Sequence, residues 1–308
     1  MPRLLPLLLL LAACSPVVRP AALAAAPDVA AAPADTVRTP CSNCTAWNRP
    51  RAPFKVFGGT YYVGTAGLGA VLVTSPEGHI LIDGALGESA PLIAANVAAL
   101  GFRMADVKLI LNTHAHFDHA GGLAALQQMS GAAVAASAPS AAVLRAGVPG
   151  RDDPQYTELA PLPFAPVPRV RVLTEGETVR VGGLALTAHA TPGHTRGGTT
   201  WTWAACEGAL CHTIVYADSI SPVSDDAFRF RGDARYPGIV QDFERTFATL
   251  EALPCDILVT PHPEASGLFE RVAARDAGAP GALVDAAACT RYAATGRERL
   301  ARRLATEG

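Results

Sequence analysis

The chain contains the stretch Thr113-His114-Ala115-His116-Phe117-Asp118-His119-Ala120-Gly121-Gly122, which places three imidazoles and one carboxylate within six residues. Directly before it, Val107 to Leu111 is β-branched and aliphatic, as expected of a buried strand that ends at a sheet edge. Side chains two residues apart in an extended segment point the same way, so His114 and His116 can converge on one metal ion. The chain then turns at Phe117, which lets the aspartate and the third histidine face a second ion. The small residues that follow open a helix.

A lone histidine near the end of a strand is usually a satisfied surface or core residue. Four ligand-type side chains within six positions are a different case, and the strand before them supplies the structural context that a metal motif requires. The helical zinc-protease string H-E-x-x-H does not occur in the sequence. The stretch therefore predicts a metal site at the edge of a sheet.

The composition indicates a globular chain with a substantial core. The 308 residues are 50% hydrophobic and 17% charged, with a formal net charge of −2. This charge balance gives no sign of a nucleic-acid partner. The 28 glycines and 25 prolines, with few aromatic residues, indicate a loop-rich α/β protein rather than a helical bundle or a disordered chain.

Strand and helix patterns occur in two similar series along the chain. Apolar or alternating runs predict strands at 61–63, 70–74, 79–83 and 107–111, and again at 169–173, 184–190, 199–203, 213–216 and from about 256. Helical patterns occur at 89–100, 122–129, 239–250 and 290–304. This succession predicts two sheets packed face to face between outer helices. The last helix is rich in arginine, which we interpret as a solvated face rather than a binding patch.

The N-terminal region has the pattern of an export signal followed by a tether. Arg3 forms a minimal positive region, and Leu4 to Ala13 is an apolar stretch too short to span a bilayer. Leu11-Ala12-Ala13-Cys14 resembles a bacterial lipobox, in which the cysteine is lipidated and attaches the protein to the outer membrane; the alternative is ordinary cleavage after Ala24-Ala25-Ala26. We expect residues 1–14 to be a signal peptide, 15–40 an Ala- and Pro-rich tether, and 41–308 a single domain that works in the periplasm or is secreted.

Cysteine spacing predicts three disulfide bonds in the exported domain. The sequence has seven cysteines, and setting Cys14 aside leaves six that can all pair in an oxidising compartment. Proximity predicts one pair across a hairpin turn, one that attaches the C-terminal helix and, by default, one near the N-terminus: Cys206 with Cys211, Cys255 with Cys289, and Cys41 with Cys44. The C-x-x-C spacing of the last pair also fits a redox or metal element, but no βαβ pattern follows it closely.

Two further histidines follow predicted strands in loops shaped by proline or glycine. His194 lies in Thr191-Pro192-Gly193-His194-Thr195, and His262 lies in Leu258-Val259-Thr260-Pro261-His262-Pro263. Each is weak evidence for a ligand when taken alone. Together with the cluster at 114–119 they complete two sets of three ligands.

Several motifs together resemble the metallo-β-lactamase superfamily and, within it, class B, subclass 3 metallo-β-lactamases. The resemblance runs from about Cys41 to the C-terminus. Besides the metal motif it includes VGT at 63–65, GHILIDG at 78–84, PGHT at 192–195, GTTWTW at 198–203, YADS at 216–219 and TPHP at 260–263. The metal motif is typical of the whole superfamily, whereas the TWTW and YADS segments narrow the resemblance to subclass 3. The resemblance implies a four-layer αββα sandwich, with the active site at the sheet edges between two related halves.

The resemblance also implies a dinuclear zinc enzyme that opens the β-lactam ring of penicillins, cephalosporins and carbapenems. Carried over residue by residue, the first zinc would be held by His114, His116 and His194, and the second by Asp118, His119 and His262. Three neutral imidazoles leave one tetrahedral position open, as a catalytic zinc requires. A hydroxide shared by two zinc ions about 3.5 to 4 Å apart would attack the β-lactam carbonyl, oriented by Asp118. No serine nucleophile is implied.

Four more residues are weaker candidates for the site. In the resembling family, serines at the places of Ser219 and Ser221 help to hold the substrate's carboxylate, although loop capping explains such serines equally well. Asp83, at the end of its strand, is expected to accept a hydrogen bond from a ligand histidine and to fix its tautomer. Gln155 could lie on the lip of the pocket, but polar exposure on a loop is the simpler explanation.

Two departures from the resembling family leave other readings open. Its members pair an N-terminal cysteine with one at the place of Ala66, so a Cys41–Cys44 bond would be a local change. Other hydrolases of the superfamily, thioesterases of the glyoxalase type and lactonases, use an aspartate near Asp218 to bridge two metals. The alternative function is therefore hydrolysis of another ester, lactone or thioester, although export argues against a cytosolic glutathione thioester. A non-catalytic zinc protein is a third reading, against which the open zinc position argues. A monomer with a small-molecule substrate is expected.

Overall fold

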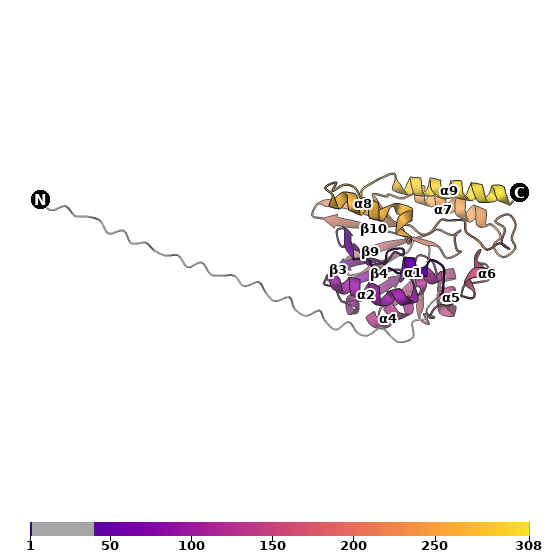
Figure 1. Cartoon of the computed structure of the whole chain (residues 1–308), viewed down its shortest axis with the longest axis horizontal. Coiled ribbons are helices and arrows are strands. Elements are labelled where there is room, and N and C mark those ends of the chain that lie inside the picture. Colours follow the sequence, from indigo (N-terminus) through magenta and orange to yellow (C-terminus); the bar gives the residue numbers. More distant parts are fainter. Residues whose placement is uncertain (2–39, 308) are drawn as a thin grey trace.

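Two β-sheets lie face to face in the middle of the molecule, and helices cover their outer faces (Figure 1). The computed structural model describes Met1 and residues 40–307. The predicted signal peptide beyond Met1, Cys14 and the tether up to residue 39 lie outside the described residues. The predicted αββα sandwich is confirmed.

The first sheet contains seven strands in chain order. Antiparallel pairs join β1 through β4, and parallel pairs join β4 through β7. Because β4 and β5 run parallel, the segments that follow them leave the sheet at the same edge. The strands are β1 Phe54–Phe57, β2 Thr60–Tyr62, β3 Val71–Ser75, β4 Gly78–Ile82, β5 Val107–Leu111, β6 Ala133–Ser137 and β7 Val170–Leu173.

The second sheet contains five strands in the order β12-β11-β10-β9-β8. Only β11 and β12 run parallel; the other neighbours are antiparallel. The strands are β8 Thr178–Val181, β9 Leu184–Ala190, β10 Thr199–Glu207, β11 Leu210–Tyr216 and β12 Ile257–Val259.

The helices divide between the two outer faces: α2, α4 and α5 lie on the side of the first sheet, and α7, α8 and α9 on the side of the second (Figure 1). Their bounds are α1 Cys44–Trp47, α2 Ala90–Ala99, α3 Phe117–Ala120, α4 Leu123–Ser130, α5 Ala138–Ala146, α6 Tyr156–Leu159, α7 Ile239–Ala252, α8 Leu268–Asp276 and α9 Ala288–Thr306, with short 3₁₀ turns η1 Gly87–Ser89, η2 Met104–Asp106 and η3 Pro263–Ser266. Among residues 40–307, no helix is both long and apolar enough to cross a membrane.

Alternation along the strands builds a separate hydrophobic layer on each side of each sheet. In β4, Leu81 packs in the outer cluster with α2, whereas Ile80 and Ile82 pack between the sheets, against Trp201 and Trp203. A third cluster joins the outer face of the second sheet to α7 and α9. Side chains of a strand alternate between faces, so a strand buried on both sides reads as a continuous apolar run.

Three disulfide bonds join the same cysteine pairs as the sequence predicts. Cys206 and Cys211 face each other across the β10–β11 hairpin. Cys255, just before β12, bonds to Cys289 in the first turn of α9 and so attaches this helix to the second sheet. Cys41 bonds to Cys44 at the start of α1.

The sequence patterns missed β1, β6, β8, α5 and α8, and also the short helices α1 and α6. Two of these elements, β6 (AVAAS) and α5 (APSAAVLRA), follow each other directly and are rich in alanine. Alanine is a strong helix former and a weak strand former, and its small side chain carries little periodic signal. The strand therefore forms because β5 and β7 flank it, which the local sequence does not reveal.

Candidate metal centre

The six predicted ligands come from three strand ends that meet at one edge of the sandwich. His114 and His116 follow β5, and Asp118 and His119 lie on the short helix α3 that comes next. The other two ligands, His194 and His262, follow β9 and β12. The topology therefore brings together residues that are as much as 148 positions apart (262 minus 114).

His114, His116 and His194 form a compact buried set. Their ligand atoms lie within 4.8 Å of one another. The ring centroids are 4.8 Å apart for His114 with His116, 4.8 Å for His114 with His194, and 5.0 Å for His116 with His194. Packing of three rings this tightly, with little water available, is costly unless they share a ligand.

A separate hydrogen bond fixes each ring of this set. His114 Nδ1 lies 2.7 Å from Asp218 Oδ1, and His116 Nε2 lies 2.8 Å from Asp153 Oδ2. His194 Nδ1 donates to the Ser221 carbonyl at 2.9 Å. Because one nitrogen of each ring takes part in such a hydrogen bond, the other nitrogen of that ring is free to bind a cation.

Burial keeps two of these rings neutral, as metal ligation requires. Burial lowers the pKa of His194 to about 3, and with the neighbouring histidines it lowers the pKa of His114 well below its ordinary value. The pKa of His116 is also lowered by burial, but Asp153 and Asp118 raise it more, so its net shift is upward. In the described structure His114 Nε2 is buried without a hydrogen-bond partner, which is costly unless a cation binds there.

The second set is centred on Asp118. Its Oδ2 lies 3.3 Å from His119 Nε2 and 3.4 Å from His262 Nε2. The rings of His119 and His262 are 4.8 Å apart, and the ring of His119 is 4.5 Å from that of His114. The two sets therefore adjoin at His114, which with Asp118 and His119 also has its ligand atoms within 4.8 Å. Five imidazoles and one carboxylate are a donor set typical of zinc.

Asp83 was predicted to bind a ligand histidine, and the structure places it elsewhere. Its carboxylate accepts hydrogen bonds from Asn112 Nδ2 at 3.0 Å, from Thr113 N at 2.8 Å and from Thr113 Oγ1 at 2.8 Å. Asp83 directly follows β4, and the parallel neighbour β5 presents its own C-terminal turn there. Asp83 thus holds the backbone that leads to His114, and Asp218 and Asp153 are the carboxylates that contact ligand histidines.

Asp218 does not lie between the two ligand sets. It is fully buried and contacts the Nδ1 side of His114, whereas the free Nε2 lies on the opposite side of that ring. An aspartate behind a ligand orients that ligand and does not bridge two ions. Asp218 therefore does not have the position of the metal-bridging aspartate that would indicate a thioesterase or lactonase.

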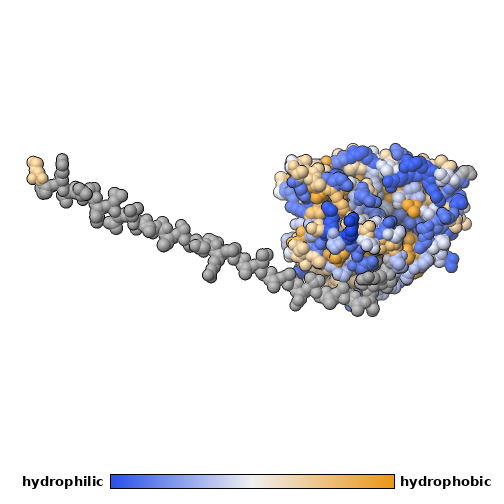
Figure 2. Space-filling model, in the orientation of Figure 1, coloured by the Kyte–Doolittle hydropathy of each residue, from blue (hydrophilic) through white to orange (hydrophobic). Residues whose placement is uncertain are grey.

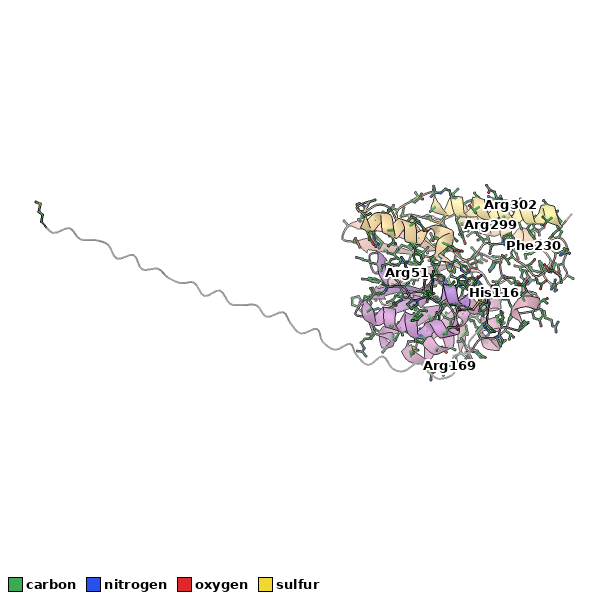
Figure 3. The ribbon with its side chains drawn as sticks, in the orientation of Figure 1. Arg51, His116, Arg169, Phe230, Arg299 and Arg302 are labelled. Carbon is green, nitrogen blue, oxygen red and sulfur yellow. A yellow bond between two sulfur atoms is a disulfide. The ribbon has the colours of Figure 1, made fainter. Side chains whose placement is uncertain are left out.

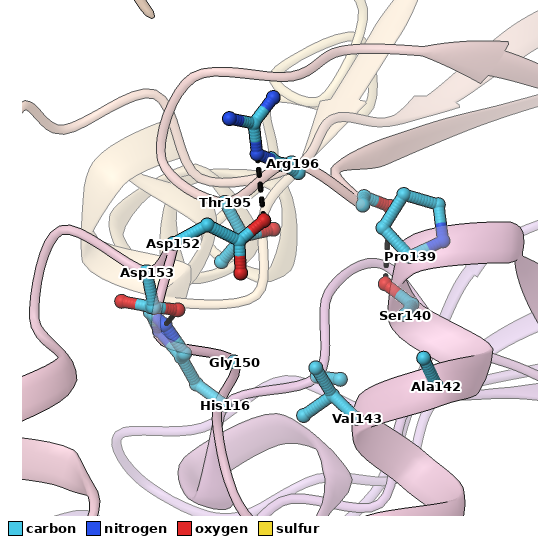
Figure 4. Close-up of a pocket in the computed structure, with 12 residues that line it drawn as sticks. His116, Pro139, Ser140, Ala142, Val143, Gly150, Asp152, Asp153, Thr195 and Arg196 are labelled. Carbon is cyan, nitrogen blue, oxygen red and sulfur yellow. Dashed lines mark hydrogen bonds and ion pairs between the residues drawn. The ribbon is translucent and has the colours of Figure 1, made fainter. Parts of the chain in front are cut away.

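Asp153 is a site residue for which no motif gave a signal. It lies in the loop before α6, 37 residues from His116. Figure 4 shows it beside His116, next to the ion pair in which Arg196 Nε lies 2.6 Å from Asp152 Oδ2. The other oxygen of Asp153 accepts the backbone N–H of Gln155 at 2.8 Å. The loop that carries Gln155 is therefore fastened to the first ligand set.

A cavity of about 220 Å³ opens beside the second ligand set. The predicted substrate residues Ser219 and Ser221 line it together with His262 and Trp47, whose ring lies 5.3 Å from that of His262. Gln155 does not line this cavity, and its substrate contact stays a prediction. The site thus combines a buried cluster of candidate metal ligands with an open space next to it.

Comparisons with known proteins agree with this geometry. Residues 70–262 match the family described as the metallo-beta-lactamase superfamily. The solved structure of Rm3 metallo-beta-lactamase is 53% identical, covers 87% of this chain and 99% of its own, and superposes with a TM-score of 0.85. MEM-A1, a subclass B3 metallo-beta-lactamase isolated from a soil metagenome library, is 50% identical, covers 85% of this chain and 98% of its own, and has a TM-score of 0.83.

A more distant relative is named for a different activity, the hydrolysis of a glutathione thioester. A hydroxyacylglutathione hydrolase of Cereibacter sphaeroides is 31% identical over 182 residues, which are 58% of this chain and 58% of that protein. The chain thus spans little more than half the length of this curated relative, whereas it covers almost the whole of the two solved structures. The chain therefore belongs to the metallo-beta-lactamase superfamily and, within it, to the subclass B3 metallo-beta-lactamases.

Proposed function

We propose that the protein hydrolyses the amide bond of β-lactam antibiotics with two zinc ions. The observation that carries the proposal is the pair of adjoining ligand sets beside an open cavity, with His262 joined to the second set through Asp118. His114, His116 and His194 would hold one ion, and Asp118, His119 and His262 the other. Zinc bound there supplies a Lewis acid for the lactam carbonyl and lowers the pKa of a water molecule to about 7.

The side chains around the ligands supply positioning and charge. Asp218, Asp153 and the Ser221 carbonyl hold the three rings of the first set, so that set is preorganised before substrate binds. Burial raises the pKa of Asp118, but His119 and His262 lower it more, so its carboxylate stays ionised. An ionised Asp118 can accept a hydrogen bond from the attacking water and so orient it.

A serine nucleophile is not part of this proposal. Ser221 Oγ lies 3.4 Å from His194 Nδ1, at the limit of a hydrogen bond. That nitrogen already donates its proton to the Ser221 carbonyl, so it has no lone pair with which to deprotonate the hydroxyl. The catalytic histidine that a serine hydrolase needs is therefore not available to Ser221.

The direct test is hydrolysis by purified, zinc-loaded protein. We expect loss of the lactam absorbance of a penicillin or a carbapenem, full inhibition by a chelator, and recovery when zinc is added back. The Asp118→Asn variant should lose most of this turnover. A His189→Ala variant is the matched control, because His189 bonds to Thr202 on the second sheet and belongs to neither ligand set. Turnover that survives the chelator would exclude the proposal.

A thioester hydrolase is the second candidate, and the distant hydroxyacylglutathione hydrolase relative is what supports it. The same zinc-loaded protein should be offered a glutathione thioester and a homoserine lactone beside the β-lactams. We expect at least a hundredfold preference for the β-lactams, about 2.7 kcal/mol of transition-state discrimination. A preference for the thioester would reverse the assignment. No turnover of any of these substrates would favour a non-catalytic zinc protein.

We also propose that the protein is exported and anchored by a lipid on Cys14. The lipobox-like segment supports this, although it lies outside the described residues. The protein expressed from its full sequence should incorporate labelled palmitate and partition into detergent. A Cys14→Ala variant should do neither, whereas equal labelling of the variant would show that Cys14 is not the site.

A further inference from the structure

The cavity beside the metal centre contains a cation that the proposed mechanism does not use. Arg299 of α9 lines this space together with Ser219, Ser221 and His262. The guanidinium is exposed, so it can meet a solute that enters. Figure 3 shows Arg299 on α9, near Arg302.

Arg299 differs from the other arginines of its helix. Four of them form ion pairs: Arg291 with Asp285, Arg297 with Glu244 and Glu251, Arg302 with Glu298, and Arg303 with Glu307. Arg299 has no carboxylate partner within the described part of the chain. The residues one turn away on its helix are Thr295, Gly296, Arg302 and Arg303, none of which is acidic. Figure 2 shows hydrophilic surface over α9, and the interpretation of this helix as a solvated face fits the paired arginines. It does not account for Arg299.

Two contacts fix α9 against the segment that carries the two serines. Tyr292 Oη donates to the Asp218 carbonyl at 3.0 Å. One turn later, Gly296 approaches so closely that an added Cβ would lie 2.6 Å from Ile220 Cδ1, the side chain between Ser219 and Ser221. Arg299 follows Tyr292 by seven residues, two helical turns, and therefore projects from the same face. The packing of the helix therefore places Arg299 at the cavity that the two serines line.

We propose that Arg299 binds the carboxylate of the substrate and so determines specificity, an inference that rests on the proposed function. Penicillins, cephalosporins and carbapenems carry a carboxylate on the ring fused to the lactam. A planar guanidinium binds a carboxylate through paired, charge-assisted hydrogen bonds, whereas serine hydroxyls supply only neutral ones. Glu264 also lines the cavity and repels an anion. The carboxylate of the substrate should therefore bind next to Arg299 and away from Glu264.

The test compares Arg299→Gln with Arg302→Gln, a matched loss of charge one turn along the same helix. Arg302 is exposed and does not line the cavity. Benzylpenicillin and its methyl ester serve as substrates with and without the carboxylate. For the free acid we expect Arg299→Gln to raise KM about tenfold, the size of one charge-assisted hydrogen bond, with kcat little changed. For the ester, both variants should match the wild type, and Arg299→Lys should recover part of the loss.

The other possible outcomes distinguish a wrong role for Arg299 from a wrong proposed function. An unchanged KM for the free acid in Arg299→Gln would overturn the role of Arg299, as would an equal change for acid and ester, which a structural disturbance of α9 would cause. Zinc content and thermal unfolding of both variants should equal those of the wild type. A wild-type protein that turns over neither substrate would overturn the proposed function itself, and the inference with it.

Discussion

Replacement of Asp153 by alanine should weaken zinc binding at the first ligand set. Asp153 Oδ2 accepts the Nε2–H of His116 at 2.8 Å, and both side chains are nearly inaccessible to solvent. Without the carboxylate, that N–H is buried without an acceptor, and the ring is free to turn its other nitrogen away from His114 and His194. Loss of a hydrogen bond to a charged acceptor costs about 1.5 to 3 kcal/mol. This corresponds to a loss of roughly 10- to 100-fold in metal affinity, the range typical of such supporting carboxylates.

The assay is a competition titration with a chromophoric zinc chelator, which reports affinity without any need for catalysis. Asp152→Asn is the matched control, since Asp152 is the neighbouring residue and its partner Arg196 belongs to neither ligand set. We expect the control to bind both ions as the wild type does. In Asp153→Ala, zinc affinity should fall only for the binding step that belongs to the first ligand set, and the affinity of the second set should stay unchanged. Asp153→Asn keeps an acceptor oxygen and should fall between the two. Wild-type affinity for both ions in Asp153→Ala would refute this reasoning.

Three further changes test other parts of the structure. His262→Ala should reduce bound zinc from two ions toward one while the fold persists; full metal content by elemental analysis would show that His262 is not a ligand. Loss of the bond between Cys255 and Cys289, which closes a loop with a sequence separation of 34, should cost about 3 to 4 kcal/mol in urea unfolding, and an unchanged midpoint would contradict this. Gly296→Ala places a Cβ 2.7 Å from Phe247 and should cost about 1 to 3 kcal/mol by overpacking. A thermal midpoint equal to the wild type would mean that α9 can move aside without cost.

The ligand-bearing segments could be predicted because their signal is local. His114 to His119 are close in sequence, and the strand before them is a clear apolar run. The fold followed from the same kind of pattern, since continuous apolar runs mark strands buried on both faces. His194 and His262 gave a weaker signal, since each only follows a predicted strand in a loop shaped by proline or glycine. The resemblance then assigned one of them to each ligand set.

Of the residues that orient the ligands, Asp153 could not be found in this way, and the resemblance indicated Asp218 only as a possible bridge between two metals. Asp153 and Asp218 lie 37 and 104 positions from the histidines they contact, and neither belongs to a metal motif. Asp83 was assigned to a ligand histidine because it ends a strand beside the motif, yet a position at a strand end does not say which neighbour the side chain faces. The structure shows that it faces Thr113, across the β4–β5 pair. Side-chain partners of this kind depend on register and topology, which sequence patterns describe poorly.

The segment from Asp218 to Ser221 connects two of the proposed metal ligands to the outer helix α9. Asp218 holds His114, the Ser221 carbonyl holds His194, and Ile220 between them packs against Gly296 of α9. Two of the three ligands in the first set therefore take their orientation from four consecutive residues, and α9 fixes the position of those residues. A displacement of α9 should then disturb zinc affinity and substrate binding together, although no residue of the helix belongs to either ligand set. We therefore expect variants of the outer helix that keep the fold but lower zinc affinity, and the effect must pass through the segment from Asp218 to Ser221.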